Sequence, residues 1–265
     1  MAQAVLDRAA ANVLRSKFAV GLFDRPYPDP AATAGINSAA HKAVARRVVA
    51  EGAVLLRNEP GGRGLPLRLT AASRVAVIGP NADDAKSQCG GYTNFGAGVS
   101  TVLGAAPAYL GGAAVVAARG CEATGNSTEG FAAALDAAAG ADAVVVVVGD
   151  SGAKGWTQNT CGEDDDRTQL DLPGVQPELL AALAANLSGT ATPLVVVLIH
   201  GRPVSFVRHD LLPRLPAVLA AWRPGEEGGA GIWELLLGRQ SPSGRLSQAR
   251  RRGPCSNSSA PHSRL

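Results

Sequence analysis

The chain has 265 residues, of which 46% are hydrophobic and 18% charged, a balance that excludes an intrinsically disordered protein. Its formal net charge of +3 gives no argument for a nucleic-acid or membrane partner, and we expect neither. The longest apolar runs, 143–148 and 194–199, are far shorter than the roughly 20 residues of a membrane span. The length fits one large domain with attached pieces.

The first predicted element is a helix over residues 4–20, because apolar side chains recur there at helical spacing until Gly21. Charged side chains interrupt its apolar face at Asp7, Arg8 and Arg15. A secretory signal needs an uninterrupted apolar core, so we expect no export signal in this segment. A proline-rich linker follows the helix.

The remaining elements alternate between strands and helices. A helix is predicted over 38–51, with Ser38 as its N-cap, and leads into the short apolar segment 53–56. Strong apolar runs rich in β-branched residues occupy 74–78, 142–148 and 193–199, and weaker ones 113–117 and 217–222. Helical patterns lie at 128–139, 176–186 and 226–237. Continuous apolar strands imply burial on both faces, so we predict an α/β domain with a doubly wound, mostly parallel sheet flanked by helices.

In such sheets ligands bind outside the carboxyl ends of the strands, so we expect chemistry in the loops after Gly79, Gly149 and Gly201. The first of these loops has neither the glycine fingerprint of a dinucleotide site nor a Walker lysine, and we expect no cofactor. The stretch 247–265 is rich in Ser, Arg and Pro without periodicity, which predicts a disordered basic tail.

The loop after the strand 142–148 is long, polar and acidic. It contains Asp150 and Trp156, and then the run Glu163, Asp164, Asp165, Asp166 and Arg167. Adjacent carboxylates repel, so at least one should hold its proton more tightly, while Arg167 would keep another ionised. A general acid beside a charged structural group arises in this way. The alternative is a solvated acidic loop. The run lacks the ligand spacing of a calcium loop, so we expect no metal.

Other polar and aromatic residues give weaker signals. His200, at a strand end, is expected to be packed and hydrogen-bonded. Glu226 and Glu227 lie at the start of a predicted helix, and helix capping explains both. Trp222 and Trp156 fit two roles equally well, as core residues or as platforms on which a sugar stacks. Four cysteines without a C-x-x-C pair argue against a zinc site: Cys89, Cys121, Cys161 and Cys255.

Six ordered motifs span roughly residues 4–246. They are 17–24 (KFAVGLFD), 51–59 (EGAVLLRNE) with 65–67 (LPL), 75–82 (VAVIGPNA), Gly162-Glu163-x-x-Asp166-Arg167 with Leu172-Pro173-Gly174-x-Gln176, Trp222-x-Pro224-Gly225-x-Glu227-Gly228-Gly229, and 242–246 (PSGRL). In this order they resemble glycoside hydrolase family 3, especially its β-xylosidase and β-glucosidase members. The resemblance implies an O-glycosyl hydrolase that acts on β-linked xylosides or glucosides, as in xylan breakdown.

The resemblance also implies roles for individual residues. In this family of retaining hydrolases an aspartate of an N-terminal barrel attacks the sugar, and in many members a glutamate of the second domain protonates the leaving group. Glu163 matches that acid. Four further residues are then expected to bind substrate: Asp150, Trp156, Asp166 and Arg167. The site is expected to need no metal and no cofactor.

On this resemblance, residues 1–37 correspond to the last helix of the barrel and a linker, and residues 38–246 to the α/β sandwich domain. The chain is expected to be truncated, without the barrel and its nucleophile, and therefore inactive alone. The alternative is a non-catalytic carbohydrate-binding or remnant module. The parent family is often secreted, so the compartment of this chain stays open.

Overall fold

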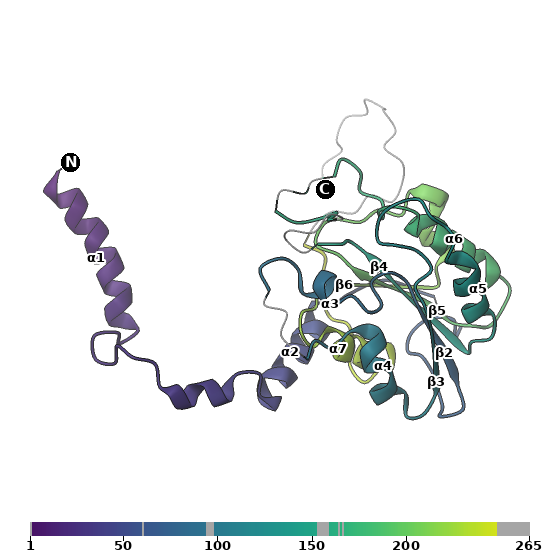
Figure 1. Ribbon diagram of the computed structural model, residues 1–265, viewed down its shortest axis with the longest axis horizontal. Coiled ribbons are helices and arrows are strands. Elements are labelled where there is room, and N and C mark those ends of the chain that lie inside the picture. Colours follow the sequence, from purple (N-terminus) through teal and green to yellow (C-terminus); the bar gives the residue numbers. More distant parts are fainter. Residues whose placement is uncertain are drawn as a thin grey trace. The chain divides into compact units, whose positions relative to one another are not determined.

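The computed structural model describes residues 2–59, 61–93, 98–152, 159–163, 165 and 167–247. The chain divides into two compact units, Met1–Ala43 and Val44–Leu265. The first contains α1 (Gln3–Ala19), which confirms the first predicted helix, and the short 3₁₀ helix η1 (Pro30–Gly35) (Figure 1). Within the described part of the chain, no helix is long and apolar enough to cross a bilayer.

The next helix, α2 (Ala39–Gly52), begins where the sequence predicts. The main-chain nitrogen of His41 donates to Ser38 Oγ over 3.4 Å, so Ser38 supplies the predicted cap.

The second unit is built on a six-stranded sheet. Its strands are β1 (Val54–Asn58), β2 (Arg74–Ile78), β3 (Ala114–Ala118), β4 (Ala143–Gly149), β5 (Leu194–Ile199) and β6 (Ala217–Trp222). Their order across the sheet is β1-β6-β5-β4-β2-β3, and every neighbouring pair is parallel except β1 with β6. The predicted doubly wound, mostly parallel sheet is confirmed.

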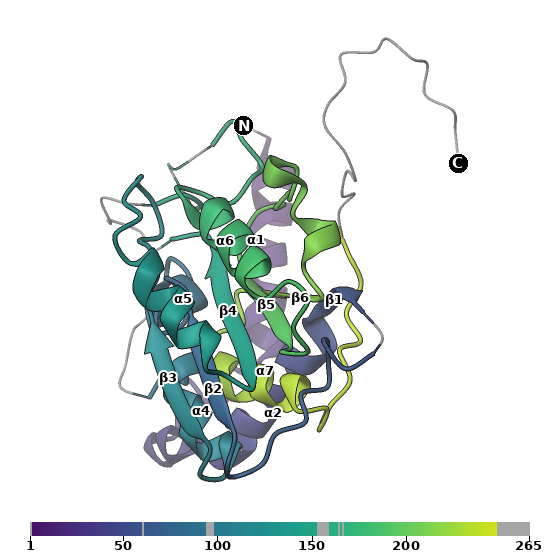
Figure 2. The same ribbon diagram turned by 90° about the vertical axis from the view of Figure 1, so that its right-hand side faces the viewer.

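Helices cover both faces of this sheet. They are α3 (Ala85–Cys89), α4 (Val102–Leu110), α5 (Phe131–Ala139), α6 (Gln176–Asn186) and α7 (Gly228–Leu236), with the 3₁₀ helices η2 (Arg208–Asp210) and η3 (Leu212–Arg214) between β5 and β6. Figure 2 shows α5 and α6 on one face and α4 and α7 on the other. The sequence predicts α5, α6 and α7 but neither α3 nor α4.

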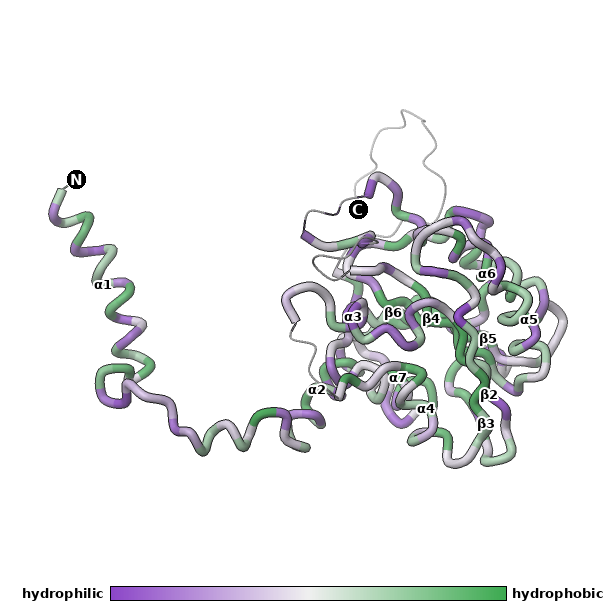
Figure 3. Tube along the Cα trace, in the orientation of Figure 1, coloured by the Kyte–Doolittle hydropathy of each residue, from purple (hydrophilic) through white to green (hydrophobic). Residues whose placement is uncertain are grey.

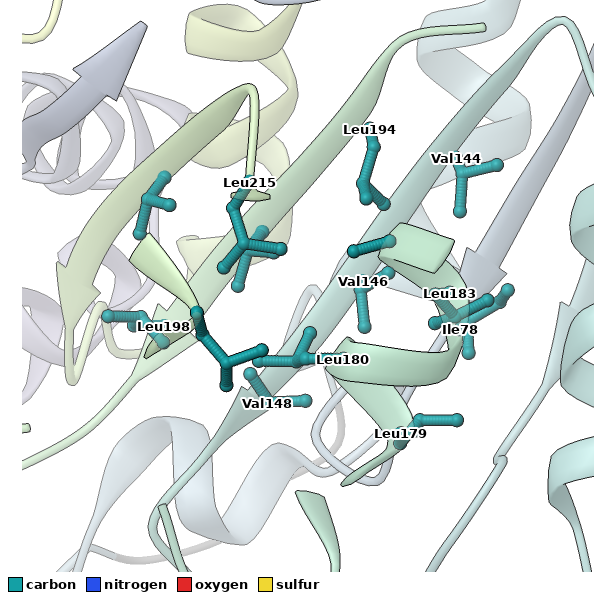
Figure 4. Close-up of a cluster of buried hydrophobic side chains, with 14 of the residues drawn as sticks. Ile78, Val144, Val146, Val148, Leu179, Leu180, Leu183, Leu194, Leu198 and Leu215 are labelled. Atoms are coloured by element: carbon teal, nitrogen blue, oxygen red, sulfur yellow. The ribbon is translucent and has the colours of Figure 1, made fainter. Parts of the chain in front are cut away.

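The core consists of two apolar layers that share the strands. Along β4 all seven residues are buried. Val144, Val146 and Val148 pack on the side of α5 and α6, where Figure 4 shows them with leucines of α6, and the alternate residues pack with Trp233 on the side of α7. Burying such an aliphatic side chain stabilises the fold by about 1.5–3 kcal/mol. Figure 3 shows this apolar interior beneath a more polar set of connecting loops.

The winding of the sheet reverses between β2 and β4. The chain goes from β2 outward to the edge strand β3 and then returns past β2 to β4. From β4 it continues in the opposite direction across the sheet, to β5 and β6, so the connections diverge between β2 and β4. A glycine directly follows β2 and another ends β4, and at both positions a side chain would clash with the neighbouring strand. A Cβ on Gly79 would lie 2.1 Å from the carbonyl oxygen of Val147, and one on Gly149 would lie 1.8 Å from that of Ile199. The reversal places the carboxyl ends of β2 and β4 at the switch point of the sheet, the position at which doubly wound folds bind ligands.

Candidate functional site

Asp150 lies at this switch point and ties three strand ends together. The side chain is 1% exposed. Its Oδ1 accepts from Thr160 Oγ1 over 3.2 Å and its Oδ2 from the nitrogen of Gly201 over 3.2 Å, while Asn81 Nδ2 donates to its carbonyl oxygen over 3.0 Å. Asp150 therefore anchors the loops that follow β2, β4 and β5.

The acidic segment leaves this anchor at the carboxyl edge of the sheet. Glu163 is exposed, and a short antiparallel bridge pairs its neighbour Gly162 with Asp165. Asn159 Nδ2 donates to Asp165 Oδ2 over 2.9 Å, which fixes one carboxylate of the run within the segment. The predicted site residues Trp156 and Asp166, together with Asp164, lie outside the described residues.

Arg167, which ends the acidic run in the sequence, is half-buried. Its guanidinium donates to the carbonyl oxygens of Gln169 and Asp171. Burial lowers the pKa of Arg167, and the nearby cation of Arg202 lowers it further, whereas the carboxylate of Asp150 opposes that shift. The charges of Asp150 and Arg202 therefore both act on Arg167 at this edge.

His200 and Trp222, at the ends of β5 and β6, are packed against each other. His200 is 3% exposed, its Nδ1 lies 2.7 Å from the carbonyl oxygen of Arg202, and the two rings are 4.7 Å apart. The expected packed histidine is therefore present. Trp222 also donates from Nε1 to the carbonyl oxygen of Gly52, which gives this ring a packing role.

Gln176 is a residue of this edge that the sequence did not single out as functional. Its side chain is fully buried and clamps Gly149, accepting from its nitrogen over 2.8 Å and donating to its carbonyl oxygen over 2.9 Å. Nε2 also donates to the carbonyl oxygen of Ala123. The signal was the glutamine that closes the motif Leu172-Pro173-Gly174-x-Gln176.

The expected capping by Glu227 is wrong in its detail. Glu227 occupies the N-cap position of α7 but makes no capping hydrogen bond from its side chain. Its Oε2 instead lies 2.6 Å from Arg46 Nη1, and this pairing raises the pKa of Arg46. A buried carboxylate gains more from a cation than from one main-chain donor.

No group of three potential metal ligands occurs among the residues that the structure describes. The three cysteines in that part of the chain carry free thiols: Cys89, Cys121 and Cys161. Cys255 lies outside it.

The profile of the glycosyl hydrolase family 3 C-terminal domain matches residues 53–258. A β-xylosidase from Formosa agariphila is 32% identical over 252 residues, which cover 92% of this chain and 33% of the relative. A periplasmic β-glucosidase from Salmonella typhimurium is 33% identical over 273 residues, which cover 92% of this chain and 34% of the relative. The chain spans about a third of the length of these curated relatives.

The fold is similar to those of solved enzymes. The structure of a β-glucosidase involved in saponin metabolism, from intestinal bacteria, matches with a TM-score of 0.76 and 30% identity. The match covers 93% of this chain and 38% of that chain. The six-stranded sheet and the switch point between β2 and β4 lie within the residues that match the family profile.

Proposed function

The chain belongs to glycoside hydrolase family 3, as its C-terminal domain, and from this premise we propose that it carries the general acid of a retaining glycosidase. The substrates would be β-linked xylosides or glucosides, as the names of the relatives suggest. The nucleophile would come from a barrel joined to this domain.

Glu163 is the proposed acid, and its position is the observation that carries the proposal. It is exposed, it follows a strand end at the carboxyl edge, and its segment is anchored there by the buried Asp150. An acid must reach the leaving oxygen of a bound sugar, so it has to project from the domain while its backbone is held firmly.

Four further residues are proposed to bind the sugar beside Glu163: Asp150, Trp156, Asp166 and Arg167. The anchoring role of Asp150 and the half-buried guanidinium of Arg167 support the placement of a polar substrate site at this edge.

A retaining glycosidase needs two carboxyl groups about 5–5.5 Å apart, one to attack the anomeric carbon and one to protonate the departing oxygen. The other acids near Glu163 lie in the same segment and cannot flank a sugar from its opposite side. General acid catalysis alone supplies about 10²–10⁴-fold, far below the roughly 10⁶-fold or more of an enzyme. This chain by itself should therefore show only background hydrolysis.

The test compares this chain with a longer protein that joins it to the family's barrel. In the longer protein Glu163→Gln should lower kcat on substrates with poor leaving groups by about 10²–10⁴-fold, and far less on activated aryl glycosides, which need little protonation. Glu122→Gln, a change of an exposed glutamate elsewhere, is the matched control. Normal activity of Glu163→Gln on the poor substrates would overturn the assignment. Robust turnover by the short chain would overturn the need for a second carboxylate.

A further inference from the structure

Two stretches of chain meet just beyond β4, a few residues before the proposed acid Glu163. Ser151 and Thr160 pair there: the nitrogen of Thr160 donates to the carbonyl oxygen of Ser151 over 2.7 Å, and the nitrogen of Ser151 donates to Thr160 Oγ1 over 2.9 Å. The outgoing and returning chains are therefore side by side before the chain reaches Glu163.

One side chain from another strand joins these two ends. Arg223 follows the last residue of β6, Trp222, whose φ of 57° turns the backbone at this point. Its Nη1 donates to the carbonyl oxygen of Gly152 over 3.0 Å, and its Nη2 to that of Cys161 over 3.2 Å. Its Nη1 also donates to the carbonyl oxygen of Ser87 over 2.8 Å. The guanidinium thus bridges the outgoing chain, the returning chain and α3.

Three glycines from three different loops leave room for this guanidinium. A Cβ on Gly152 would lie 2.1 Å from Arg223 Nη2, one on Gly201 would lie 2.8 Å from Nε, and one on Gly90 would lie 3.0 Å from Cδ. Any side chain at the first two positions would displace the arginine. The loops after β2, β4 and β5 are therefore shaped around the residue that directly follows β6.

We propose that Arg223 is a positioning residue that closes the contact between Gly152 and Cys161 and so fixes the direction in which Glu163, two residues after Cys161, leaves the domain. The effect of Arg223 on catalysis rests on the proposed function. Its closure of the contact between Gly152 and Cys161 does not depend on that function. Arginine suits the task because its planar, permanently charged fork can bond several carbonyl oxygens at once. A lysine keeps the charge but presents a single ammonium, which cannot span the same positions.

Cys161 provides a built-in reporter of this closure. It is 9% exposed, and its Sγ would lie 2.9 Å from a Cβ on Gly201, so the thiol is packed beside one of the glycines that leave room for Arg223. Cys121 is 6% exposed but belongs to the apolar layer on the side of α5 and α6. It reports on the stability of the core and not on the loop.

The experiment measures the alkylation rate of each thiol in the folded 265-residue chain by mass mapping, for Arg223→Lys and Arg223→Met. Loss of a hydrogen bond from a charged donor should raise the rate at Cys161 by about tenfold or more, because local opening becomes more frequent. The rate at Cys121 should stay within about twofold of the unaltered chain. Arg63→Met is the matched control, since Arg63 also donates to one carbonyl oxygen, that of Leu187, but away from this edge.

An unchanged rate at Cys161 in both variants would overturn the inference. Equal acceleration at Cys161 and Cys121 would overturn it as well, because it would mean that Arg223 supports the whole domain. Arg223→Lys guards against a variant that merely fails to fold, since it keeps the charge and most of the side-chain volume.

The catalytic consequence has a separate readout in a protein that includes the barrel. Arg223→Lys should lower kcat on substrates with poor leaving groups by about tenfold, with little change in KM or on activated substrates. If Arg223→Lys exposes Cys161 while Glu163→Gln leaves activity intact, the proposed acid is wrong and the closure by Arg223 stands. If Glu163→Gln is inactive on poor substrates but Arg223→Lys matches the unaltered enzyme, the positioning role is wrong and the acid stands.

Discussion

The interior of the sheet and its carboxyl edge are stabilised by different means. In the interior, the seven buried residues of β4 lie between apolar side chains on both faces. The stabilising free energy there is spread over many contacts. At the edge, Gln176 and Arg223 each bond two or more main-chain groups from separate segments, and the Asp150 carboxylate bonds the hydroxyl of Thr160 and the nitrogen of Gly201. In the interior, a smaller apolar side chain therefore lowers the free energy of unfolding in proportion to the volume removed. At the edge, substituting one residue removes several hydrogen bonds at once.

The largest expected effect tests the interior. Leu183→Ala removes a fully buried side chain of α6 that packs beside Val146 and Ile78, and should lower the free energy of unfolding by about 2–5 kcal/mol. Leu170→Ala, at a leucine that is 54% exposed, should change it by less than about 0.5 kcal/mol. Denaturant titration checks both. Equal losses would contradict the apolar layers assigned to the two faces.

The next effect tests the edge. Gln176→Met keeps most of the side-chain volume but leaves the nitrogen of Gly149 and the carbonyl oxygen of Ala123 without their buried partner. The free energy of unfolding should fall by about 1–3 kcal/mol. Hydrogen exchange at Gly149 should also accelerate. Gln240→Met, at an exposed glutamine bonded to Glu234, is the control and should leave stability unchanged. An unaltered exchange rate at Gly149 would contradict the clamp.

Two adjacent arginines of α2 sharpen the comparison between buried and exposed charge. Arg46 pairs with Glu227, whose side chain is 7% exposed, whereas Arg47 pairs with Glu51, whose side chain is 63% exposed. Arg46→Gln should cost about 1–3 kcal/mol because it leaves a buried carboxylate without its cation. Arg47→Gln should cost about 0.3–0.5 kcal/mol. Thermal unfolding of the two variants measures the contrast, and equal shifts in Tm would contradict it.

The last test concerns the dependence of the free energy of unfolding on pH. Burial raises the pKa of Cys121 to about 12, with a further contribution from Glu122, compared with 9.0 for an unperturbed cysteine. The protonated thiol is therefore favoured in the folded state, and its contribution is complete below pH 9 and is lost as the pH rises toward 12. Between those values the free energy of unfolding should fall more steeply in the unaltered chain than in Cys121→Ala. Parallel pH curves would refute the buried thiol as the cause.

Strand positions were predictable from local patterns. Three predicted elements have the same bounds as in the structure: the strands at 74–78 and 217–222 and the helix at 176–186. The other predicted strands differ from the observed ones by one residue at one or both ends. Such continuous runs of Val, Leu, Ile and Ala, ended by glycine or by a turn, bury apolar area whatever their neighbours are. The parallel sheet followed from the same runs.

Two elements depended on distant residues. The helix α4 contains Pro107, a residue that usually ends a helix, and is held by the cap from Thr101 and by Trp233 of α7, whose Nε1 donates to the carbonyl oxygen of Val102. The strand β1 is antiparallel because it pairs with β6, more than 150 residues later in the chain. Neither partner is visible in a local window of sequence.

At the candidate site, the sequence by itself determined that an acidic segment with Glu163 follows a buried strand. Only the tertiary structure placed Arg223 beside Gly152 and Cys161, and Gln176 against Gly149. The physical reason is the range of the interactions. Apolar burial is set by composition and periodicity within one strand, whereas a hydrogen bond between a side chain and a distant carbonyl oxygen needs both positions fixed to within about 3 Å by the rest of the fold.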